Sequence, residues 1–154
     1  MAEKSATSGS RVVVVALDGS EFSQNAFNWY KEHIYRPDDF VIAVHSPEYH
    51  HCLNAGHERP DIKQVVDQME QEQQKKNKML EGFSALLSDA GMTGKVKSVI
   101  GNPGEVIVRI ADEENASMII TGARGIGKIR RTLLGSVSDY IVHHSHVPVT
   151  VCRR

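Results

Sequence analysis

Residues 12–17 of this chain read Val-Val-Val-Val-Ala-Leu, and residues 18–20 read Asp-Gly-Ser. An uninterrupted run of β-branched residues is typical of a strand that is covered on both faces, as the strands of parallel sheets are. The Asp-Gly-Ser that ends the run combines a turn signal with a helix N-cap signal. Beyond it, apolar residues recur at helical spacing from Phe22 to His33. These twenty-odd residues therefore predict a buried parallel strand that leads directly into a helix.

The same alternation of strand and helix continues to the end of the chain. Four further buried strands are expected, at residues 40–45, 96–100, 118–121 and 147–152. Three further helices are expected, at residues 61–88, around 106–111 and at 136–144. The pattern predicts an α/β fold, a single doubly wound five-stranded parallel sheet with helices on both faces. Ligands in such sheets bind beyond the carboxyl ends of the strands.

The helix expected at residues 61–88 has two different parts. Its inner face should carry the apolar residues Ile62, Val65, Met69, Leu80, Phe83 and Leu87. Its middle, residues 71–78, has almost no apolar content. We expect this polar middle to project into solvent, with a break in the helix as the alternative.

Composition fits one globular domain. The chain has 154 residues, of which 40% are hydrophobic and 24% charged, and its formal net charge is -1. This length allows a sizeable core, and the near-neutral charge argues against nucleic acid and anionic membranes as partners. No apolar run approaches the roughly 20 residues that span a bilayer. We expect residues 1–10 to form a flexible polar tail and residues 11–154 to form the domain.

The cysteine content indicates a compartment. The chain has two cysteines, Cys52 and Cys152. Two are too few for a disulfide framework and suit a reducing environment. A cytoplasmic location is therefore expected.

The fourth expected strand leads into a glycine-rich segment, Gly-Ala-Arg-Gly-Ile-Gly-Lys at residues 122–128, and Gly135-Ser136 opens the last helix. Glycines let backbone N–H groups approach an anion closely. The helix start adds unpaired N–H donors and the positive end of a helix dipole. The hydroxyls of Ser136 and Ser138 can donate as well. Together these parts predict a cradle for the phosphates of a nucleotide.

Two general nucleotide motifs match this segment incompletely. Residues 122–128 nearly fit the P-loop, but Ile129 stands where a hydroxyl residue should hold Mg²⁺, and no helix is expected directly after Lys128. The dinucleotide fingerprint G-x-G-x-x-G begins at Gly125 and Gly127, but Arg130 occupies the place of its third glycine. Neither motif is therefore the preferred interpretation.

A third pattern is more specific. Gly122-x-x-Gly125, nine further residues and then Gly135-Ser136 resemble the G-x2-G-x9-G-[ST] signature of ATP-binding universal stress proteins. The resemblance extends from residue 11 to residue 152 and includes Val-Ala-Leu-Asp-Gly-Ser at 15–20, Val-His at 44–45 and Gly-Asn-Pro at 101–103. It implies that residues 11–154 form a universal stress protein domain. It also implies a Rossmann-like fold, similar to that of the adenine nucleotide alpha-hydrolases, with strand order 3-2-1-4-5.

The resemblance assigns roles to individual residues. Asp18 would hold the adenine or ribose end of the nucleotide, and Val44 would contact the base through its backbone. Phosphate and ribose contacts are implied for Gly122, Arg124, Gly125, Gly135, Ser136, Val137 and Ser138. The strand-end residues that complete the expected site are Ala16, Leu17 and Thr121. The implied ligand is ATP, with AMP and ADP as alternatives and Mg²⁺ or Mn²⁺ held through the phosphates.

Two of these positions depart from the family pattern. Ala16 stands where a proline is commoner, and Arg124 stands where His or Ser is frequent. Arg124 adds a cation to the phosphates in one interpretation and points to solvent in the other. Asp18 and Ser136 also fit ordinary helix caps, which is compatible with contact to a ligand.

Other reactive residues have simpler explanations. The basic cluster Lys128, Arg130 and Arg131 is typical of a solvated loop face, with steering of phosphates as the alternative. His50, His51, Cys52 and His57, in the loop at residues 50–57, lack the second pair of ligands of a closed zinc site, so no metal centre is predicted. No serine lies in a G-x-S-x-G context, and no catalytic residue is predicted.

Three functions compete. In the first, the protein is a nucleotide-dependent regulator in the stress response, and ATP orders the loop between Gly122 and Gly135. The second is a slow Mg-dependent ATP hydrolase, for which Asp18 acting through a water is the sole candidate base. The third is a nucleotide-free dimeric scaffold. The resemblance implies a homodimer through strand 147–152, where Pro148 suits an edge position.

Overall fold

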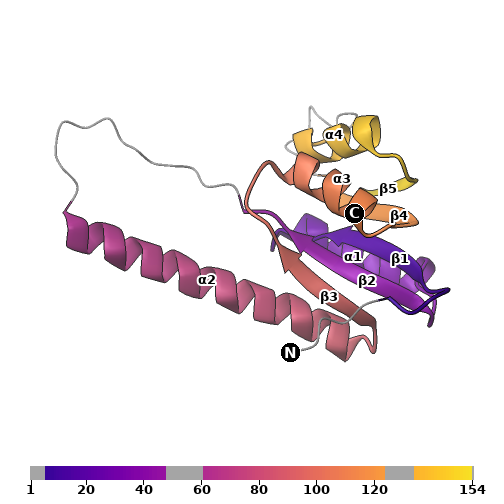
Figure 1. The fold of residues 1–154 in the computed structure, drawn as a ribbon, viewed down its shortest axis with the longest axis horizontal. Coiled ribbons are helices and arrows are strands. Elements are labelled where there is room, and N and C mark those ends of the chain that lie inside the picture. Colours follow the sequence, from indigo (N-terminus) through magenta and orange to yellow (C-terminus); the bar gives the residue numbers. More distant parts are fainter. Residues whose placement is uncertain (1–5, 48–60, 124–133, 154) are drawn as a thin grey trace.

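A five-stranded parallel sheet forms the centre of the protein (Figure 1). The computed structural model describes residues 6–47, 61–123 and 134–153. Their elements are β1 (Arg11–Ala16), α1 (Glu21–His33), β2 (Asp39–His45), α2 (Ile62–Asp89), β3 (Thr93–Ser98), α3 (Pro103–Glu113), β4 (Met118–Gly122), α4 (Ser136–His144) and β5 (Val149–Cys152). The strands lie in the order β3-β2-β1-β4-β5, which confirms the predicted topology.

Helices cover both faces of the sheet, and alternate side chains of each strand point to opposite faces. Val13 and Val15 of β1 pack in the cluster that α1 and α2 complete. Val12 and Val14 pack in the cluster on the other face, which α3 and α4 cover. The central strand is therefore buried on both sides, and its continuous run of valines is the consequence.

The edge strand β3 lies about three residues earlier than the sequence predicted. The expected strand was 96–100, but pairing with β2 covers Thr93–Ser98 and sets Gly94 opposite Val41. A Cβ atom at Gly94 would lie 2.0 Å from the Val41 carbonyl oxygen, so the pair requires a glycine. Lys95 and Lys97 form ion pairs with Glu114, beyond the end of α3. An edge strand with alternating lysines has no continuous apolar run, which is why the pattern misplaced it.

α2 is one continuous helix of 28 residues, without the break considered as an alternative. Its buried residues are Phe83 and Leu87, both in its last two turns. A helix of this length is about 42 Å long, whereas the six residues of β3 span about 20 Å. The first half of α2 therefore extends past the sheet (Figure 1).

The predicted inner face of α2 is correct for its second half and wrong for its first. Ile62, Val65 and Met69 are exposed to 80%, 37% and 65%. The helical period persists there, but no strand lies beneath it. Within the described residues, no helix is both long and apolar enough to cross a membrane.

Candidate functional site

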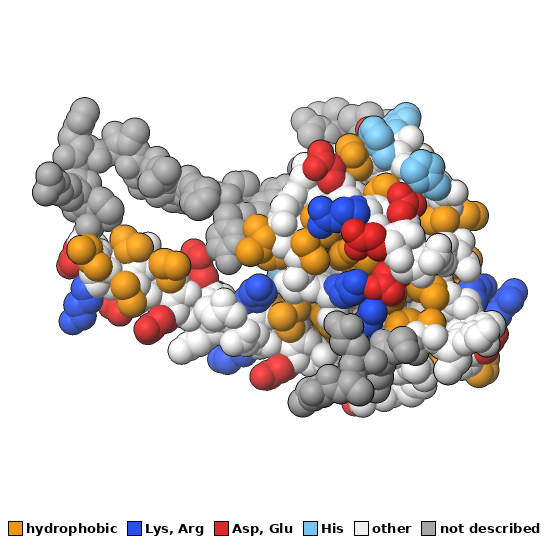
Figure 2. All heavy atoms as spheres, in the orientation of Figure 1, with side chains coloured by type: hydrophobic (Ala, Val, Ile, Leu, Met, Phe, Trp, Pro, Cys, Tyr) orange, Lys and Arg blue, Asp and Glu red, His pale blue; other side chains and the backbone are white. Residues whose placement is uncertain are grey.

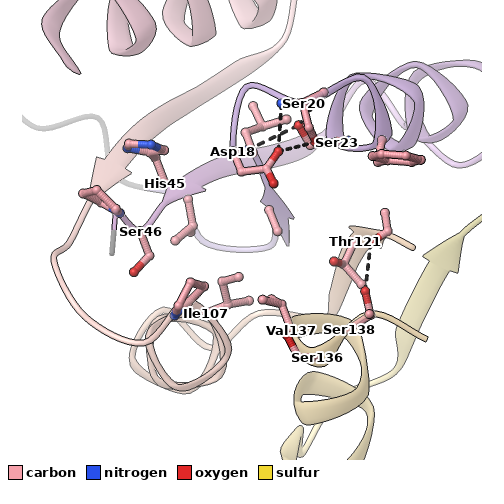
Figure 3. Close-up of a pocket in the computed structure, with 18 residues that line it drawn as sticks. Asp18, Ser20, Ser23, His45, Ser46, Ile107, Thr121, Ser136, Val137 and Ser138 are labelled. Atoms are coloured by element: carbon pink, nitrogen blue, oxygen red, sulfur yellow. Dashed lines mark hydrogen bonds between the residues drawn. The ribbon is translucent and has the colours of Figure 1, made fainter. Parts of the chain in front are cut away.

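A pocket of about 400 Å³ opens at the carboxyl edge of the sheet, between β1 and β4 (Figure 3). Strand order reverses at this point, since the chain moves from β1 outward to β3 and then returns to β4. The connections from the two strands leave toward opposite faces, and the space between them is not filled by a crossover. Topology alone thus places the pocket where a ligand of this fold class is expected.

Ten of the twelve residues predicted for the site line this pocket. They are Ala16, Leu17, Asp18, Val44, Thr121, Gly122, Gly135, Ser136, Val137 and Ser138. The other two, Arg124 and Gly125, lie outside the described residues, as does the loop with His50, His51, Cys52 and His57. Segments more than one hundred residues apart in the sequence, at Asp18 and at Ser136, are brought to one cavity.

Among the described residues, eight others line the pocket and were not predicted. They are Ser20, Phe22, Ser23, His45, Ser46, Pro47, Pro103 and Ile107. The three that end or follow β2 could have been found from the rule that ligands bind at carboxyl ends of strands. The first turn of α3 follows the carboxyl end of β3, so the same rule places it at this edge of the sheet, but the packing of α3 decides that Pro103 and Ile107 reach the pocket.

Three helices begin at the pocket, and their first turns differ. The Ser20 side chain accepts a hydrogen bond from a backbone N–H of α1, and Asn102 does the same for α3. The N-cap of α4 is Gly135, which has no side chain to accept one. The amides that begin α4 therefore have no side-chain cap, and the positive end of the helix dipole faces the cavity. This is the place in the pocket where an anionic group is best stabilised.

The first turn of α4 is tied to the end of β4. The Ser138 hydroxyl donates to the Gly122 carbonyl at 2.8 Å. Gly122 itself lies against the start of α1, where an added Cβ would come within 2.5 Å of the Phe22 carbonyl oxygen. Gly122 is therefore required by close backbone packing, independently of any ligand.

Asp18 faces α4 across the cavity (Figure 3). Its Oδ1 accepts hydrogen bonds from the backbone N–H of Ser20, at 2.9 Å, and from the Ser20 hydroxyl. The Asp18 amide in turn donates to the Ser23 hydroxyl at 3.3 Å. These bonds fix the turn between β1 and α1, so the carboxylate is held at the mouth of the pocket in a defined direction. A carboxylate in this position can accept hydrogen bonds from sugar hydroxyls.

His45 forms a neutral part of the wall. The residue is buried, its ring lies 5.8 Å from that of Phe83, and its Nδ1 lies 3.4 Å from the Ser98 hydroxyl. Burial lowers the pKa of this imidazole, and the Lys76 ammonium lowers it further, against an opposite effect of Asp18. The ring is therefore uncharged at neutral pH. Among the described residues, no group of three His, Cys, Asp or Glu side chains is arranged to hold a metal ion.

Sequence comparison places this architecture among known proteins. The model of the universal stress protein family matches residues 9–153. Universal stress protein YxiE of Bacillus subtilis is 30% identical over 153 residues, which cover 92% of this chain and 97% of YxiE. Universal stress protein MJ0577 of Methanocaldococcus jannaschii is 40% identical over 79 residues, 51% of this chain. That match spans about half (48%) of the length of MJ0577.

Solved structures share the fold over nearly the whole chain. The structure of MJ0577 has a TM-score of 0.71 at 27% identity and covers 94% of this chain and 96% of its own. A universal stress protein of Arabidopsis thaliana, whose crystal structure has AMP bound, has a TM-score of 0.66 at 20% identity. It covers 94% of this chain and 92% of the Arabidopsis chain. At that identity the likeness concerns the fold.

Proposed function

This chain belongs to the universal stress protein family, and on that premise we propose that it binds ATP in the pocket and acts as a nucleotide-dependent regulator in the stress response. The observation that carries the proposal is the start of α4, which has no side-chain cap and lies in the same cavity as Asp18. One end of the cavity suits an anion and the other suits a hydroxylated sugar. A nucleotide has both groups.

The remaining lining suits the base. The ends of β1 and β2 contribute the buried residues Leu17 and Val44, and α3 contributes Ile107. A flat, largely apolar base fits between such side chains, while strand-end backbone groups supply directional hydrogen bonds. The AMP bound by the Arabidopsis relative supports an adenine nucleotide as the ligand class. In this proposal the twelve predicted residues form the binding site, Arg124 and Gly125 included.

A divalent ion would be held mainly by the phosphates. Asp18 is the one carboxylate among the described lining residues. A single carboxylate fits the usual mode of Mg²⁺, which keeps several waters and binds through substrate phosphates. Besides Asp18, the one acid–base side chain among the described lining residues is His45, which is buried in the wall, so we favour a regulator over an ATPase.

The test is isothermal titration of the purified chain with Mg-ATP, AMP and ADP. Ser136 is the first residue of α4, and Gly135 before it has φ -61° and ψ 158°, the conformation favoured before proline. Ser136→Pro therefore removes one amide donor at a position where helices tolerate proline. We expect it to weaken ATP binding by about tenfold or more, because one hydrogen bond from the helix to a charged phosphate is lost.

Ser136→Ala is the matched control, because it keeps the amide and loses the hydroxyl alone. It should weaken binding less than Ser136→Pro. Substitution of Gly122 is unsuitable, since any Cβ there collides with the backbone of α1. If the unaltered chain binds none of the three nucleotides, the nucleotide-free scaffold becomes the preferred function.

We extend the proposal to a homodimer through β5, in the cytoplasm. β5 is an edge strand, and its residues Val149, Thr150 and Val151 are partly exposed. Unprotected edges of this kind pair with copies of themselves. The presence of two cysteines in the whole chain suits a reducing compartment and supports the cytoplasmic location. Val151→Lys should shift the sedimentation coefficient from dimer to monomer, and an unchanged dimer would refute this interface.

A further inference from the structure

The first half of α2 carries an apolar surface that nothing in the described structure covers. Every residue from 61 to 75 is exposed. Figure 2 shows hydrophobic side chains gathered at this end of the helix, away from the body of the protein. Four of the six large hydrophobic side chains that are exposed among the described residues lie here, namely Ile62, Val65, Val66 and Met69. We call these four residues the α2 stripe.

The α2 stripe has the geometry of a helix-pairing surface. Its members are spaced by three, four and seven residues, so they share one side of the helix. Val66 is 45% exposed and Met69 is 65% exposed, which leaves apolar area available to a partner. Contiguous exposed apolar surface on a protein of this size marks an interaction site.

The α2 stripe is its own complement. When two copies of the helix lie antiparallel with residue i opposite residue 131 − i, Ile62 meets Met69 and Val65 meets Val66. Each contact occurs twice by symmetry, so all four side chains of one copy meet apolar side chains of the other. Residues 71–75 remain as a spacer of about one turn, which keeps the two bodies apart.

The charges beside the α2 stripe fit the same pairing. Lys63 and Glu70 are seven residues apart and lie on the same side of the stripe. A two-fold antiparallel pair sets equal sides of the two helices next to each other. Lys63 of one copy then lies about two residues, or about 3 Å along the axis, from Glu70 of the other. Neither side chain forms an ion pair elsewhere in the described part of the chain.

We propose that the α2 stripe is a docking surface for a second copy of this chain, bound antiparallel through residues 61–70. The interface is smaller than the roughly 1,200–2,000 Å² of a standard one, so the contact is weak and concentration-dependent. It does not depend on nucleotide binding, and it is separate from the edge of β5. Where β5 also pairs, the two contacts link dimers into larger assemblies.

The first test is sedimentation velocity of the full chain in a Val151→Lys background, which removes pairing through β5. The sedimentation coefficient of this variant should still rise with protein concentration up to the millimolar range. Adding Met69→Glu should raise the dissociation constant by about tenfold or more, since an apolar contact made twice is lost. Gln71→Glu is the matched control, because it adds the same charge on the opposite side of the helix. It should leave the dissociation constant within about twofold.

The second test uses the charges and needs no apolar change. Lys63→Glu alone and Glu70→Lys alone each set like charges against each other, and each should weaken self-association. An equimolar mixture of the two variants restores both opposite-charge contacts and should associate as the unaltered chain does. Weakening by each single change together with rescue by mixing is the signature of an antiparallel second copy.

The third test is disulfide trapping in a Cys52→Ser background. Val66→Cys lies at the centre of the pair and should give a covalent dimer under mild oxidation, while Gln71→Cys should stay monomeric. Circular dichroism of each variant confirms that it is folded. No concentration dependence in sedimentation, or equal trapping at positions 66 and 71, would overturn the proposal. Single variants that associate as the unaltered chain does, or weakened single variants that the mixture does not rescue, would overturn it as well.

Discussion

At the amino edge of the sheet, Asp39 is 1% exposed, whereas at the carboxyl edge Asp18 is exposed at the mouth of the pocket. Both residues flank a strand of the same sheet, Asp39 at the start of β2 and Asp18 just after β1. They differ in what surrounds them. One is enclosed by partners from its own chain, and the other is presented to a cavity.

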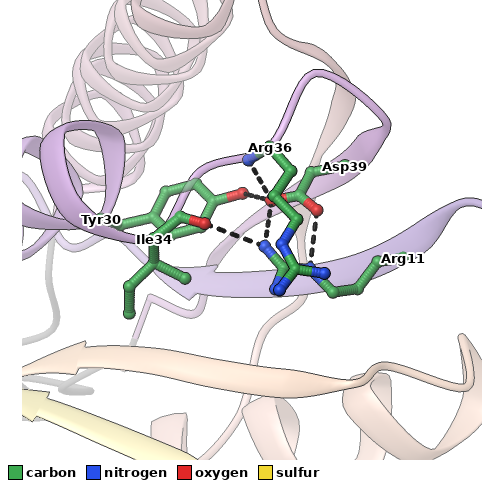
Figure 4. Close-up of polar contacts among 5 residues, drawn as sticks. All are labelled: Arg11, Tyr30, Ile34, Arg36 and Asp39. Carbon is green, nitrogen blue, oxygen red and sulfur yellow. Dashed lines mark hydrogen bonds and ion pairs between the residues drawn. The ribbon is translucent and has the colours of Figure 1, made fainter.

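The enclosed carboxylate has four hydrogen-bond donors (Figure 4). Arg11 binds it with both Nε, 2.7 Å from Oδ1, and Nη2, 2.6 Å from Oδ2. The Tyr30 hydroxyl donates to Oδ2 at 2.6 Å, and the Arg36 amide does so at 3.0 Å. Burial by itself would raise the pKa of Asp39, but these hydrogen bonds outweigh it and hold the pKa below its ordinary value.

The same chemical group thus has its bonding capacity met inside the chain at one edge and, in the proposed function, contacts a ligand at the other. The bonding capacity of Asp39 is met inside the chain, so removing it leaves buried donors without an acceptor. At the carboxyl edge, α4 begins at a glycine with no side chain to accept from its amides, and the Asp18 carboxylate faces it. Donors arranged around an open cavity have capacity for a ligand. Substitutions at the two edges should therefore separate folding from binding.

The largest expected effect is on folding, from Asp39→Ala. This change removes the carboxylate that pairs with the Arg11 guanidinium and the acceptor of the Tyr30 hydroxyl, and it should lower the free energy of unfolding by about 3–5 kcal/mol. Urea denaturation followed by circular dichroism measures it. Asp38→Ala, at the exposed neighbouring acid, should cost less than about 0.5 kcal/mol. Equal losses at the two positions would remove the distinction between the edges.

Tyr30→Phe should have an intermediate effect. The ring still fills its place in the core, but one buried donor to Asp39 is lost, at a cost of about 1–2 kcal/mol. Tyr35→Phe is the control, because the Tyr35 hydroxyl makes no hydrogen bond within the described residues. Both are measured by the same denaturation. A Tyr30→Phe variant as stable as the parent would mean that the other donors satisfy Asp39 without the hydroxyl.

Acid should act on the same group. The folded pKa of Asp39 lies below its unfolded value of about 3.9, so its contribution is fully present above that pH. The contribution is lost as pH falls through the folded pKa, with a slope of at most about 1.4 kcal/mol per pH unit for one proton. The pKa of Glu114 is also lowered, by Lys97 and Lys95, so acid destabilises the parent through this group too. The contribution of Asp39 is therefore measured as the difference between the parent and a variant that lacks its carboxylate. Stability of the parent minus that of Asp39→Asn should shrink from about pH 4 downward.

The smallest effect on stability is expected at the carboxyl edge. Asp18→Ala loses the hydrogen bonds to Ser20 and should cost less than about 1 kcal/mol of unfolding free energy. Calorimetric titration should nevertheless show ATP binding weakened by about tenfold, through loss of a charged acceptor. A variant that loses stability but binds normally would place Asp18 with Asp39 as a structural residue.

The sequence by itself determined the fold class. Strands rich in β-branched residues that alternate with helices along the chain are stable as a parallel sheet covered by helices, and few other architectures bury such strands on both faces. It also determined most of the pocket. Strand ends and the first turns of the helices that follow them meet at one edge in any sheet of this type. The pocket residues at such positions include Asp18, Val44, Thr121 and Ser136. Short-range signals sufficed wherever the local pattern and the topology agree.

Tertiary structure alone decided the rest. The register of β3 depends on a backbone contact between Gly94 and Val41, which no periodicity reveals. Pro103 and Ile107 reach the pocket because of how α3 packs on the face of the sheet that it shares with α4. Met69 and Leu87 belong to one helical pattern, yet only Leu87 has a sheet beneath it. Periodicity specifies which side of an element is apolar, whereas burial depends on what other segments of the chain lie against that side.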